Sequence, residues 1–329
     1  MLKKVEQLSI NNLNLPDKKL HSYTLVDKRL LHLNENLDFN LFEQDSPTHM
    51  SLFLQSDTII DRQQKGKISK VEQLYIRDND RNRYEKFLEK NLEYLLEDKS
   101  LTISEKTELI YSSTTELAHS LYENPEALEN VRRSKAIVTP IISTVLESEE
   151  TIASYIKIIE YDYYTHTHSL NVSIYAICLG LELGLDEKTL TKLGHAALLH
   201  DLGKSKIDQK IVVKDGSLTQ EEFTIMKTHP TLGYEIAKKI GLNDKDILDA
   251  IKHHHEKLNG RGYPDGLKGD EISFFPRIIA VCDVFDALTT NRTYKDALTS
   301  FSALGLMKSE MNDHLDMKIL NTFIKMLHN

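Results

Sequence analysis

Three apolar helical stretches of this chain carry ionisable side chains, and this constrains the fold more than any other sequence feature. His200 and Asp201 follow two leucines in AALLHDLGK, residues 196–204. His254 continues the apolar stripe of a second stretch, and Asp283 lies inside the apolar stretch RIIAVCDVFDAL. A buried charge is costly unless it is paired or binds a metal. We therefore expect the helices to bring these residues together.

The residue types indicate what such a cluster could hold. Ile247, Ala250, Ile251 and His254 have the i, i+3, i+4, i+7 spacing of one inward helical face. A single buried histidine or aspartate is more often a hydrogen-bonded core residue than a metal ligand. Several in one helical domain favour a site, and imidazole with carboxylate suits divalent iron, manganese, nickel or zinc.

Composition limits the class of protein. The 329 residues carry a formal net charge of −9, which argues against sequence-independent binding to duplex nucleic acid. We expect no membrane span, because there is no apolar run of about 18 residues. The start MLKKVEQLSINN lacks the apolar stretch of a secretion signal, and two cysteines indicate no disulfide framework. These features favour a cytoplasmic location.

The pattern changes along the chain. Residues 1–80 show short alternating runs, such as residues 37–41, 50–54 and 74–76, separated by SPT and QKGK turns, which predicts a small α/β domain. Residues 81–150 read as a helical connector, with a break at Asn124-Pro125 and a kink or boundary at Pro140. Residues 151–329 read as almost entirely helical, and a capping box at Thr219–Glu222 begins one of these helices. The predicted fold class is α+β, with an all-α C-terminal bundle.

One loop completes the pattern. The stretch HHHEKLNGRGYPDG, residues 253–266, places glycines and a proline directly after a histidine cluster. Glycine lets a loop turn sharply and bring its backbone close to a ligand. Taken alone, Tyr263-Pro264 is an ordinary turn.

Five motifs in order resemble one family. They are DYYTHTHSLNVS, HDLGK, KTHPTLG, HHEKLNGRGYPDG and AVCDVFDALTTNRTYK. Together they resemble the HD-GYP domain, a branch of the HD phosphohydrolases that hydrolyses the bacterial messenger cyclic di-GMP. The resemblance runs from about Thr151 to about Phe323, and it implies an HD-type helical bundle.

The resemblance also implies a dinuclear metal centre. The first metal would be held by His168, His200, Asp201 and Asp283, and the second by His229, His254 and His255, with Asp201 bridging the two. Two metals about 3.5–4 Å apart can activate a water and clamp a phosphate. The resemblance favours iron or manganese, and the sequence does not choose between them.

Further residues are implied for the substrate. Lys204 would neutralise a phosphate oxygen, so we assign it a catalytic role beside Asp201. The other substrate contacts would be Gly262, Tyr263, Pro264, Arg292 and Lys295. Taken singly, Lys204, Arg292 and Lys295 would read as solvated surface cations. His166, His195 and His253 match no family ligand, and we expect structural or surface roles for them.

Three positions depart from the family pattern. Tyr164 stands where some members have a glutamate for a third metal, so we predict two metals. Asn259 replaces an aspartate before the GYP loop, and Thr293 replaces a proline in the phosphate-binding element. These departures affect the expected affinity and rate rather than the type of reaction.

The predicted function is hydrolysis of cyclic di-GMP to pGpG, with further cleavage to GMP left open. One alternative is a weakly active cyclic di-GMP sensor that acts through protein partners. A second is a phosphodiesterase for another cyclic dinucleotide, such as cyclic GMP-AMP. Signalling partners of the N-terminal domain and a homodimer are also open.

Overall fold

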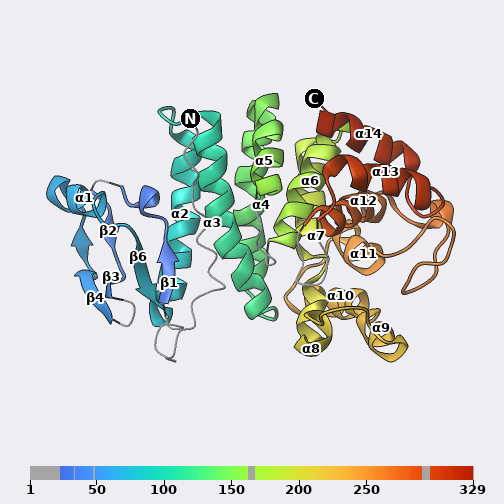
Figure 1. Cartoon of the computed structure of the whole chain (residues 1–329), viewed down its shortest axis with the longest axis horizontal. Coiled ribbons are helices and arrows are strands. Elements are labelled where there is room, and N and C mark those ends of the chain that lie inside the picture. Colours follow the sequence, from blue (N-terminus) through green and yellow to red (C-terminus); the bar gives the residue numbers. More distant parts are fainter. Residues whose placement is uncertain (1–22, 33, 47–48, 162–166, 291–296, 329) are drawn as a thin grey trace. The chain divides into compact units, whose positions relative to one another are not determined.

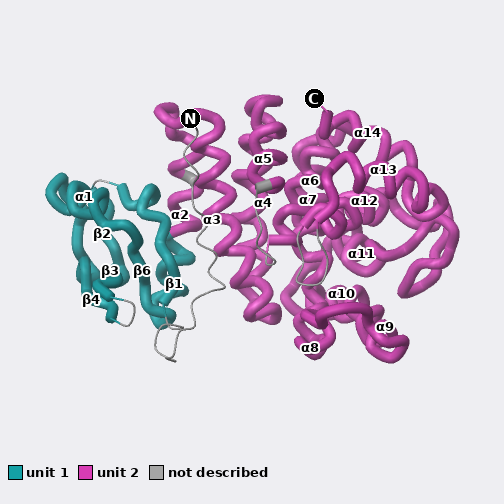
Figure 2. The backbone as a smooth tube through the Cα atoms, in the orientation of Figure 1, with its two compact units in different colours: residues 1–87 teal, residues 88–329 magenta. Residues whose placement is uncertain are grey.

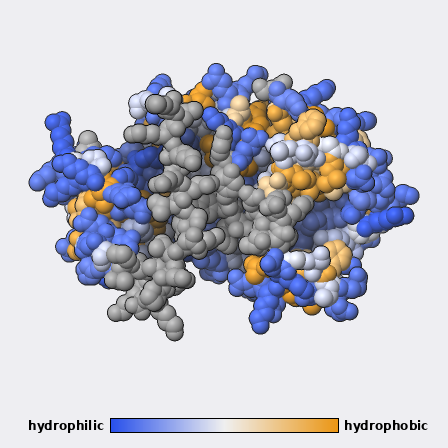
Figure 3. All heavy atoms as spheres, viewed as in Figure 1, coloured by the Kyte–Doolittle hydropathy of each residue, from blue (hydrophilic) through white to orange (hydrophobic). Residues whose placement is uncertain are grey.

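The structure, a computed structural model, describes residues 23–32, 34–46, 49–161, 167–290 and 297–328. Contacts divide the chain into two units, residues 1–87 and residues 88–329 (Figure 2). Among the described residues, no helix combines the length and the apolar character needed to span a membrane. On the face drawn in Figure 3, hydrophilic side chains separate patches of hydrophobic ones.

Unit 1 is built on antiparallel strands. They are β1 (Tyr23–Val26), β2 (Asn36–Leu37), β3 (Leu41–Ser46), β4 (His49–Leu54), β5 (Thr58–Ile59) and β6 (Leu74–Arg77). The order in the main sheet is β1-β6-β3-β4, and β2 pairs separately with β5. Phe42 on β3 lies opposite Tyr75 on β6. The expected strand regions around residues 50–54 and 74–76 are confirmed. The expected run at residues 37–41 is wrong as a single strand, because β2 ends at Leu37 and β3 begins at Leu41.

The expected QKGK turn is wrong, because those residues lie inside helix α1 (Arg62–Ile68). Asp61 begins this helix with a capping box: its side chain accepts from the Gln64 backbone, and the Gln64 side chain accepts from the Asp61 backbone. The reciprocal cap satisfies two backbone donors at the helix start and outweighs the cost of Gly66 in its interior.

The rest of the described chain is helical. The long N-terminal helices are α2 (Arg81–Glu97), α3 (Ile103–Glu123), α4 (Asn130–Glu147) and α5 (Glu149–Tyr161). They are followed by α6 (His168–Glu182), α7 (Glu187–Leu199), η5 (Leu202–Lys206), α8 (Gln209–Val212), α9 (Gln220–Met226), α10 (His229–Lys239), α11 (Lys245–His253), α12 (Phe274–Thr289), α13 (Ser300–Glu310) and α14 (Met317–His328) (Figure 1). The predicted α+β class with a helical C-terminal bundle is confirmed.

The sequence predicted several of the helix boundaries. Asn124 ends α3, and the predicted capping box at Thr219 begins α9. Helix α4 continues through Pro140, which is therefore not a helix boundary. The assignment of separate roles to residues 1–80, 81–150 and 151–329 stays a prediction.

Helix α6 is the centre of the bundle. All its residues from Ser169 to Gly180 are buried, and it contacts α7, α12 and α14. A helix that is apolar on every side must be covered on every side. Tyr175 of α6 packs edge-on against Phe285 of α12 and Phe323 of α14, with ring centroids 5.5 and 5.7 Å apart. This packing holds α12 and α14 beside the middle of α6.

A close backbone contact joins η5 to α10. A Cβ atom added to Gly203 would lie 1.9 Å from the His229 carbonyl oxygen and 2.4 Å from the Gly233 amide nitrogen. Only glycine fits there, because real Cβ atoms do not approach backbone atoms so closely. The contact brings Asp201, which immediately precedes η5, close to the first residue of α10.

Replacing Gly203 with alanine should therefore force the two segments apart. We expect Gly203→Ala to lower the free energy of unfolding by about 2–3 kcal/mol, because overpacking displaces the backbone. Gly305 in α13 is the control, because an added Cβ would meet nothing within 4 Å. Gly305→Ala should stabilise the protein by about 0.5–1 kcal/mol. Urea unfolding measures both, and equal effects would contradict the close contact.

Candidate metal centre

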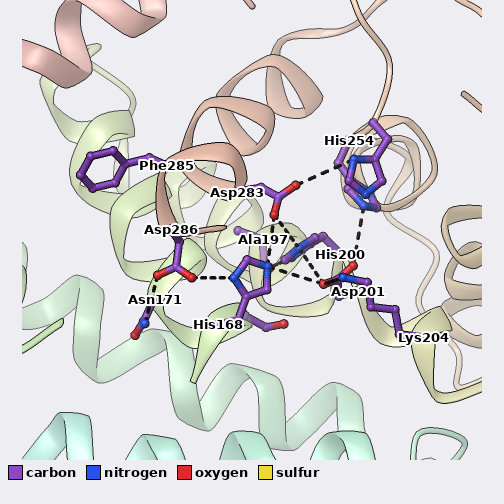
Figure 4. Close-up of polar contacts among 12 residues, drawn as sticks. His168, Asn171, Ala197, His200, Asp201, Lys204, His254, Asp283, Phe285 and Asp286 are labelled. Atoms are coloured by element: carbon purple, nitrogen blue, oxygen red, sulfur yellow. Dashed lines mark hydrogen bonds and ion pairs between the residues drawn. The ribbon is translucent and has the colours of Figure 1, made fainter. Parts of the chain in front are cut away.

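The ionisable residues predicted from the sequence lie mostly at helix ends. His168 and His229 are the first residues of α6 and α10, and His200 and His254 directly follow α7 and α11. Asp283 is the exception, lying within α12. Figure 4 shows residues from α6, α7, α12 and the end of α11 pointing toward one another. Several separate helices thus contribute to one cluster.

Three of the histidines are oriented in the same way. Nδ1 of His200 lies 2.6 Å from the Ala197 carbonyl oxygen, and the corresponding distances are 2.8 Å for His229 to Met226 and for His254 to Ile251. Each carbonyl lies in the last turn of a helix, where it has no intrahelical donor. The Nδ1–H group satisfies that carbonyl, so the Nε2 lone pair points into the cluster. This capping was not predicted from the sequence.

The side chains form two groups that could each hold a metal ion. The first contains His168, His200 and Asp283, and the second contains Asp201, His229, His254 and His255. Within each group the candidate ligand atoms all lie within 4.8 Å of one another. The structure therefore brings together all seven residues that the sequence singled out. Asp201, which was expected in the first set and as the bridge, falls in the second group here.

Asp201 connects the two groups. Its Oδ1 lies 3.2 Å from His229 Nε2, whereas its Oδ2 lies 3.4 Å from His200 Nε2 and 3.6 Å from His168 Nε2. One carboxylate thus presents a different oxygen to each group. The residue is only 3% exposed, so these contacts are made away from bulk water.

The candidate ligand atoms are better arranged to bind a metal than to form hydrogen bonds with one another. Among the described residues, Nε2 of His200 and Oδ1 of Asp201 are buried without a hydrogen-bond partner, and Nε2 of His168 lies 3.1 Å from Asp283 Oδ1. Nε2 of His229 and Nε2 of His254 face each other at 3.2 Å, although both Nδ1 atoms already donate to carbonyls. Two facing lone pairs need a cation between them. Divalent metal ions match this set of imidazole and carboxylate ligands.

The protonation states of most of these groups also suit metal binding. Despite burial, Lys204 and His200 hold the pKa of Asp201 well below its usual range. Burial lowers the pKa of His254, and burial lowers that of His255 to about 3. Ionised carboxylates and neutral imidazoles are the forms that bind metals.

His168 is held differently from the other histidines. Its Nδ1 lies 2.6 Å from Asp286 Oδ2, and Asn171 Nδ2 donates to Asp286 Oδ1 at 3.1 Å (Figure 4). Burial lowers the pKa of His168, but hydrogen bonds to Asp283 and Asp286 outweigh it and raise the pKa to about 9. A carboxylate behind a histidine is the usual arrangement that orients a metal-binding imidazole.

The GYP loop lies against the second group. The Tyr263 ring centroid is 4.8 Å from that of His255. A Cβ atom at Gly262 would lie 2.4 Å from both Glu256 Cα and the Lys257 amide nitrogen, so glycine is required there. Glu256 Oε1 accepts hydrogen bonds from the next part of the loop, at the amides of residues 265 and 266.

Two residues near the loop have structural contacts. His253 bonds Asp249 at 2.8 Å and Asp265 at 2.9 Å, which ties the loop to α11. The Asn259 side-chain amide donates to Asp313 at 3.0 Å. An aspartate at position 259 would place two carboxylates together, so the amide suits this chain.

The predicted cations are described only in part. Lys204 Nζ lies 2.5 Å from Asp201 Oδ2, beside both groups. Arg292 and Lys295 lie outside the described residues, as do Tyr164, Thr293 and His166. Pro264 follows Tyr263 in the loop beside His255, through a cis peptide bond.

Comparison with known proteins identifies the family. The model of the family described as HD domain matches residues 146–319, more than half of the chain. The chain belongs to the HD domain family. All seven clustered residues lie within the matched HD domain, and the recognition made from the five motifs is confirmed.

Relatives of this HD protein carry enzyme names. One is named cyclic di-GMP phosphodiesterase PA4108, from Pseudomonas aeruginosa, and is 35% identical over 57% of this chain and 45% of its own length. Another, from Xanthomonas campestris, is named cyclic di-GMP phosphodiesterase response regulator RpfG and is 34% identical over 59% of this chain and 53% of its own length. A third, from Vibrio cholerae, is named 3'3'-cGAMP-specific phosphodiesterase 3 and is 36% identical over 46% of this chain and 33% of its own length.

The chain therefore spans about half the length of the first two relatives. A solved structure is similar over a larger part of the chain. Bd1817, an HDG"Y"P protein from Bdellovibrio bacteriovorus, is 22% identical, with a TM-score of 0.68 over 93% of this chain and all of that one. At this identity the likeness concerns the fold.

His195, which belongs to neither group, should make stability depend on pH. Burial and nearby Lys135 lower its pKa to about 4, below the ordinary value of 6.5. Between these values the unfolded chain binds the proton and the folded protein does not, so stability is lost as pH falls. We expect His195→Leu to reduce this loss by about 1–2 kcal/mol between pH 6.5 and 5.

Urea unfolding with chelator present measures the effect without interference from metals. The same pH dependence in both proteins would contradict a buried neutral His195.

Proposed function

We propose that this HD protein is a dinuclear-metal phosphodiesterase that hydrolyses cyclic di-GMP, to pGpG or on to GMP, in bacterial signalling. The observation that carries the proposal is Asp201, whose two carboxylate oxygens face two separate groups of metal-binding residues. A shared carboxylate is the feature that a two-metal site needs and a single-metal site does not.

The ligands are assigned by group. His168, His200 and Asp283 would hold one metal and His229, His254 and His255 the other, with Asp201 bridging both. When bound, divalent ions supply a nucleophile by acidifying water, and they neutralise charge on the phosphate oxygens. Iron and manganese are the favoured ions because of the resemblance to the HD-GYP domain, while the imidazole and carboxylate ligands alone would also suit nickel or zinc.

The remaining residues would bind and orient the substrate. Lys204 stands beside Asp201 with its side chain 28% exposed, so it can turn toward a phosphate oxygen. Tyr263 offers a ring face next to the second group, and Gly262 and Pro264 fix the shape of its loop. Arg292 and Lys295 would supply the positive charge that an acidic chain needs to bind a dinucleotide.

Cyclic di-GMP is the substrate named for two relatives, and it is the one that the GYP motif implies. A second candidate is 3'3'-cyclic GMP-AMP, because a third relative is named for it. Competition between equal concentrations of the two dinucleotides decides between them. We also propose a cytoplasmic enzyme, with residues 1–80 serving for regulation, partner contact or homodimer formation.

Product chromatography tests the proposed reaction. Anaerobically purified protein is incubated with cyclic di-GMP and with added iron, added manganese or chelator. We expect pGpG or GMP to form only when metal is present. Intact substrate in a sample that contains two metals per chain would contradict the proposal.

Asp201 should be needed for metal binding and turnover together. We expect Asp201→Ala and the closer mimic Asp201→Asn to lower turnover by about 10³-fold or more and to lose metal, because the ionised carboxylate is shared. Asp246→Ala is the control, since Asp246 is an exposed residue paired with Lys192. A variant of Asp201 that keeps two metals would defeat the bridging assignment.

Arg292 should affect substrate binding alone. We expect Arg292→Ala to raise KM by about 10- to 100-fold with unchanged metal content, since one charge-assisted hydrogen bond to phosphate is worth about 1.5–3 kcal/mol. The KM of Arg292→Lys should lie between those of the unmodified protein and of Arg292→Ala, because lysine keeps the charge without the planar guanidinium group. Loss of metal in either variant would show that Arg292 has been misassigned.

A further inference from the structure

Helix α3 precedes the region that matches the HD domain, yet two of its tyrosines form hydrogen bonds to residues beside the metal centre. The match begins at residue 146, whereas α3 spans Ile103–Glu123. Helix α3 contacts both α6 and η5, the segments that follow His168 and Asp201. The hydroxyl groups of Tyr111 and Tyr122 each bond to a residue close to a candidate ligand.

Tyr111 takes part in a buried series of hydrogen bonds. Its hydroxyl donates to Asn171 Oδ1 at 2.8 Å, and Asn171 Nδ2 donates to Asp286 Oδ1 at 3.1 Å. The other oxygen of Asp286 accepts from His168 Nδ1 at 2.6 Å (Figure 4). Asn171 is 1% exposed and Asp286 is 0% exposed, so water is not at hand to replace a lost bond.

The donor-to-acceptor order of these hydrogen bonds shows how the Tyr111 hydroxyl orients the Asn171 amide. An amide presents either its oxygen or its NH₂ group to a neighbour, depending on how it is turned. Because Tyr111 can donate to Asn171 Oδ1, the NH₂ group is left to face the Asp286 carboxylate. Without that donor, Asn171 Oδ1 is left buried without this hydrogen bond, and only the bond to Asp286 still orients the amide. The carboxylate behind His168 is then held less firmly.

Tyr122 acts on the other side of the first group. Its hydroxyl donates to the Leu198 carbonyl at 2.7 Å and lies 2.7 Å from Ser169 Oγ. Ser169 follows His168 in α6, and Leu198 lies two residues before His200 in α7. One hydroxyl thus ties together the helix ends that carry two candidate ligands of the same metal.

We propose that α3 supports the metal centre. Its residues Tyr111 and Tyr122 are positioning residues for His168 and His200. The inference rests on the proposed metal centre and extends it beyond the matched HD domain. Tyr111 acts through Asn171 and Asp286, and Tyr122 acts through the ends of α6 and α7. Neither tyrosine touches a metal or substrate.

Conservative variants of the full-length protein test this. Tyr111→Phe and Tyr122→Phe each remove one hydroxyl and keep the ring. Tyr155→Phe is the matched control, because Tyr155 is fully buried and its hydroxyl bonds Thr144 at 3.1 Å, within α4 and α5. The readouts are manganese affinity, from competition with a chelator, and the midpoint of thermal unfolding.

We expect manganese affinity to fall by about tenfold in Tyr111→Phe and Tyr122→Phe, the lower end of the loss seen when supporting hydrogen bonds are removed. Manganese affinity should stay within about twofold of that of the unmodified protein in Tyr155→Phe, even if the midpoints of thermal unfolding fall equally in all three variants. Unchanged affinity in the first two variants, or an equal loss in all three, would overturn the inference.

A double variant tests the route from Tyr111. If it acts through Asp286, adding Tyr111→Phe to Asp286→Asn should weaken affinity by less than about twofold further, because residues in one network do not act additively. A full additional tenfold loss would reject that route. Failure of the unmodified protein to bind manganese would remove the metal centre and this inference together. Metal binding without hydrolysis of cyclic di-GMP would contradict only the proposed substrate.

Discussion

The buried carboxylate of Asp201 is the interaction on which the site depends. At 3% exposure it requires compensation, and a lysine, three histidines and the first turn of η5 surround it. Its two oxygens face different groups of ligands, so its position determines the separation of those groups. Gly203 makes this position attainable, because any side chain there would separate η5 from α10.

Helix ends supply most of the remaining geometry. An α-helix leaves its last carbonyls without donors, and a histidine just beyond the end can satisfy one of them through Nδ1. His200, His229 and His254 all do so, and in each case the opposite nitrogen points into the cluster. The same hydrogen bonds that cap the helices therefore select the tautomer that can bind a metal.

Much of this could be predicted from the sequence. Periodicity predicted the helical bundle, and charge inside apolar stretches selected residues that the structure groups together. The contacts of Tyr111 could not be predicted, because a hydrogen bond to Asn171 across 60 positions depends on packing and leaves no local pattern. The predicted QKGK turn is wrong because the capping box at Asp61 outweighs the cost of Gly66 inside α1.

Anomalous diffraction from crystals of the manganese-loaded protein tests whether Asp201 bridges two metal ions. We expect two manganese peaks about 3.5–4 Å apart, one at each group, with Asp201 contributing one oxygen to each ion. A single peak at full occupancy, or two ions without a shared contact to Asp201, would contradict it.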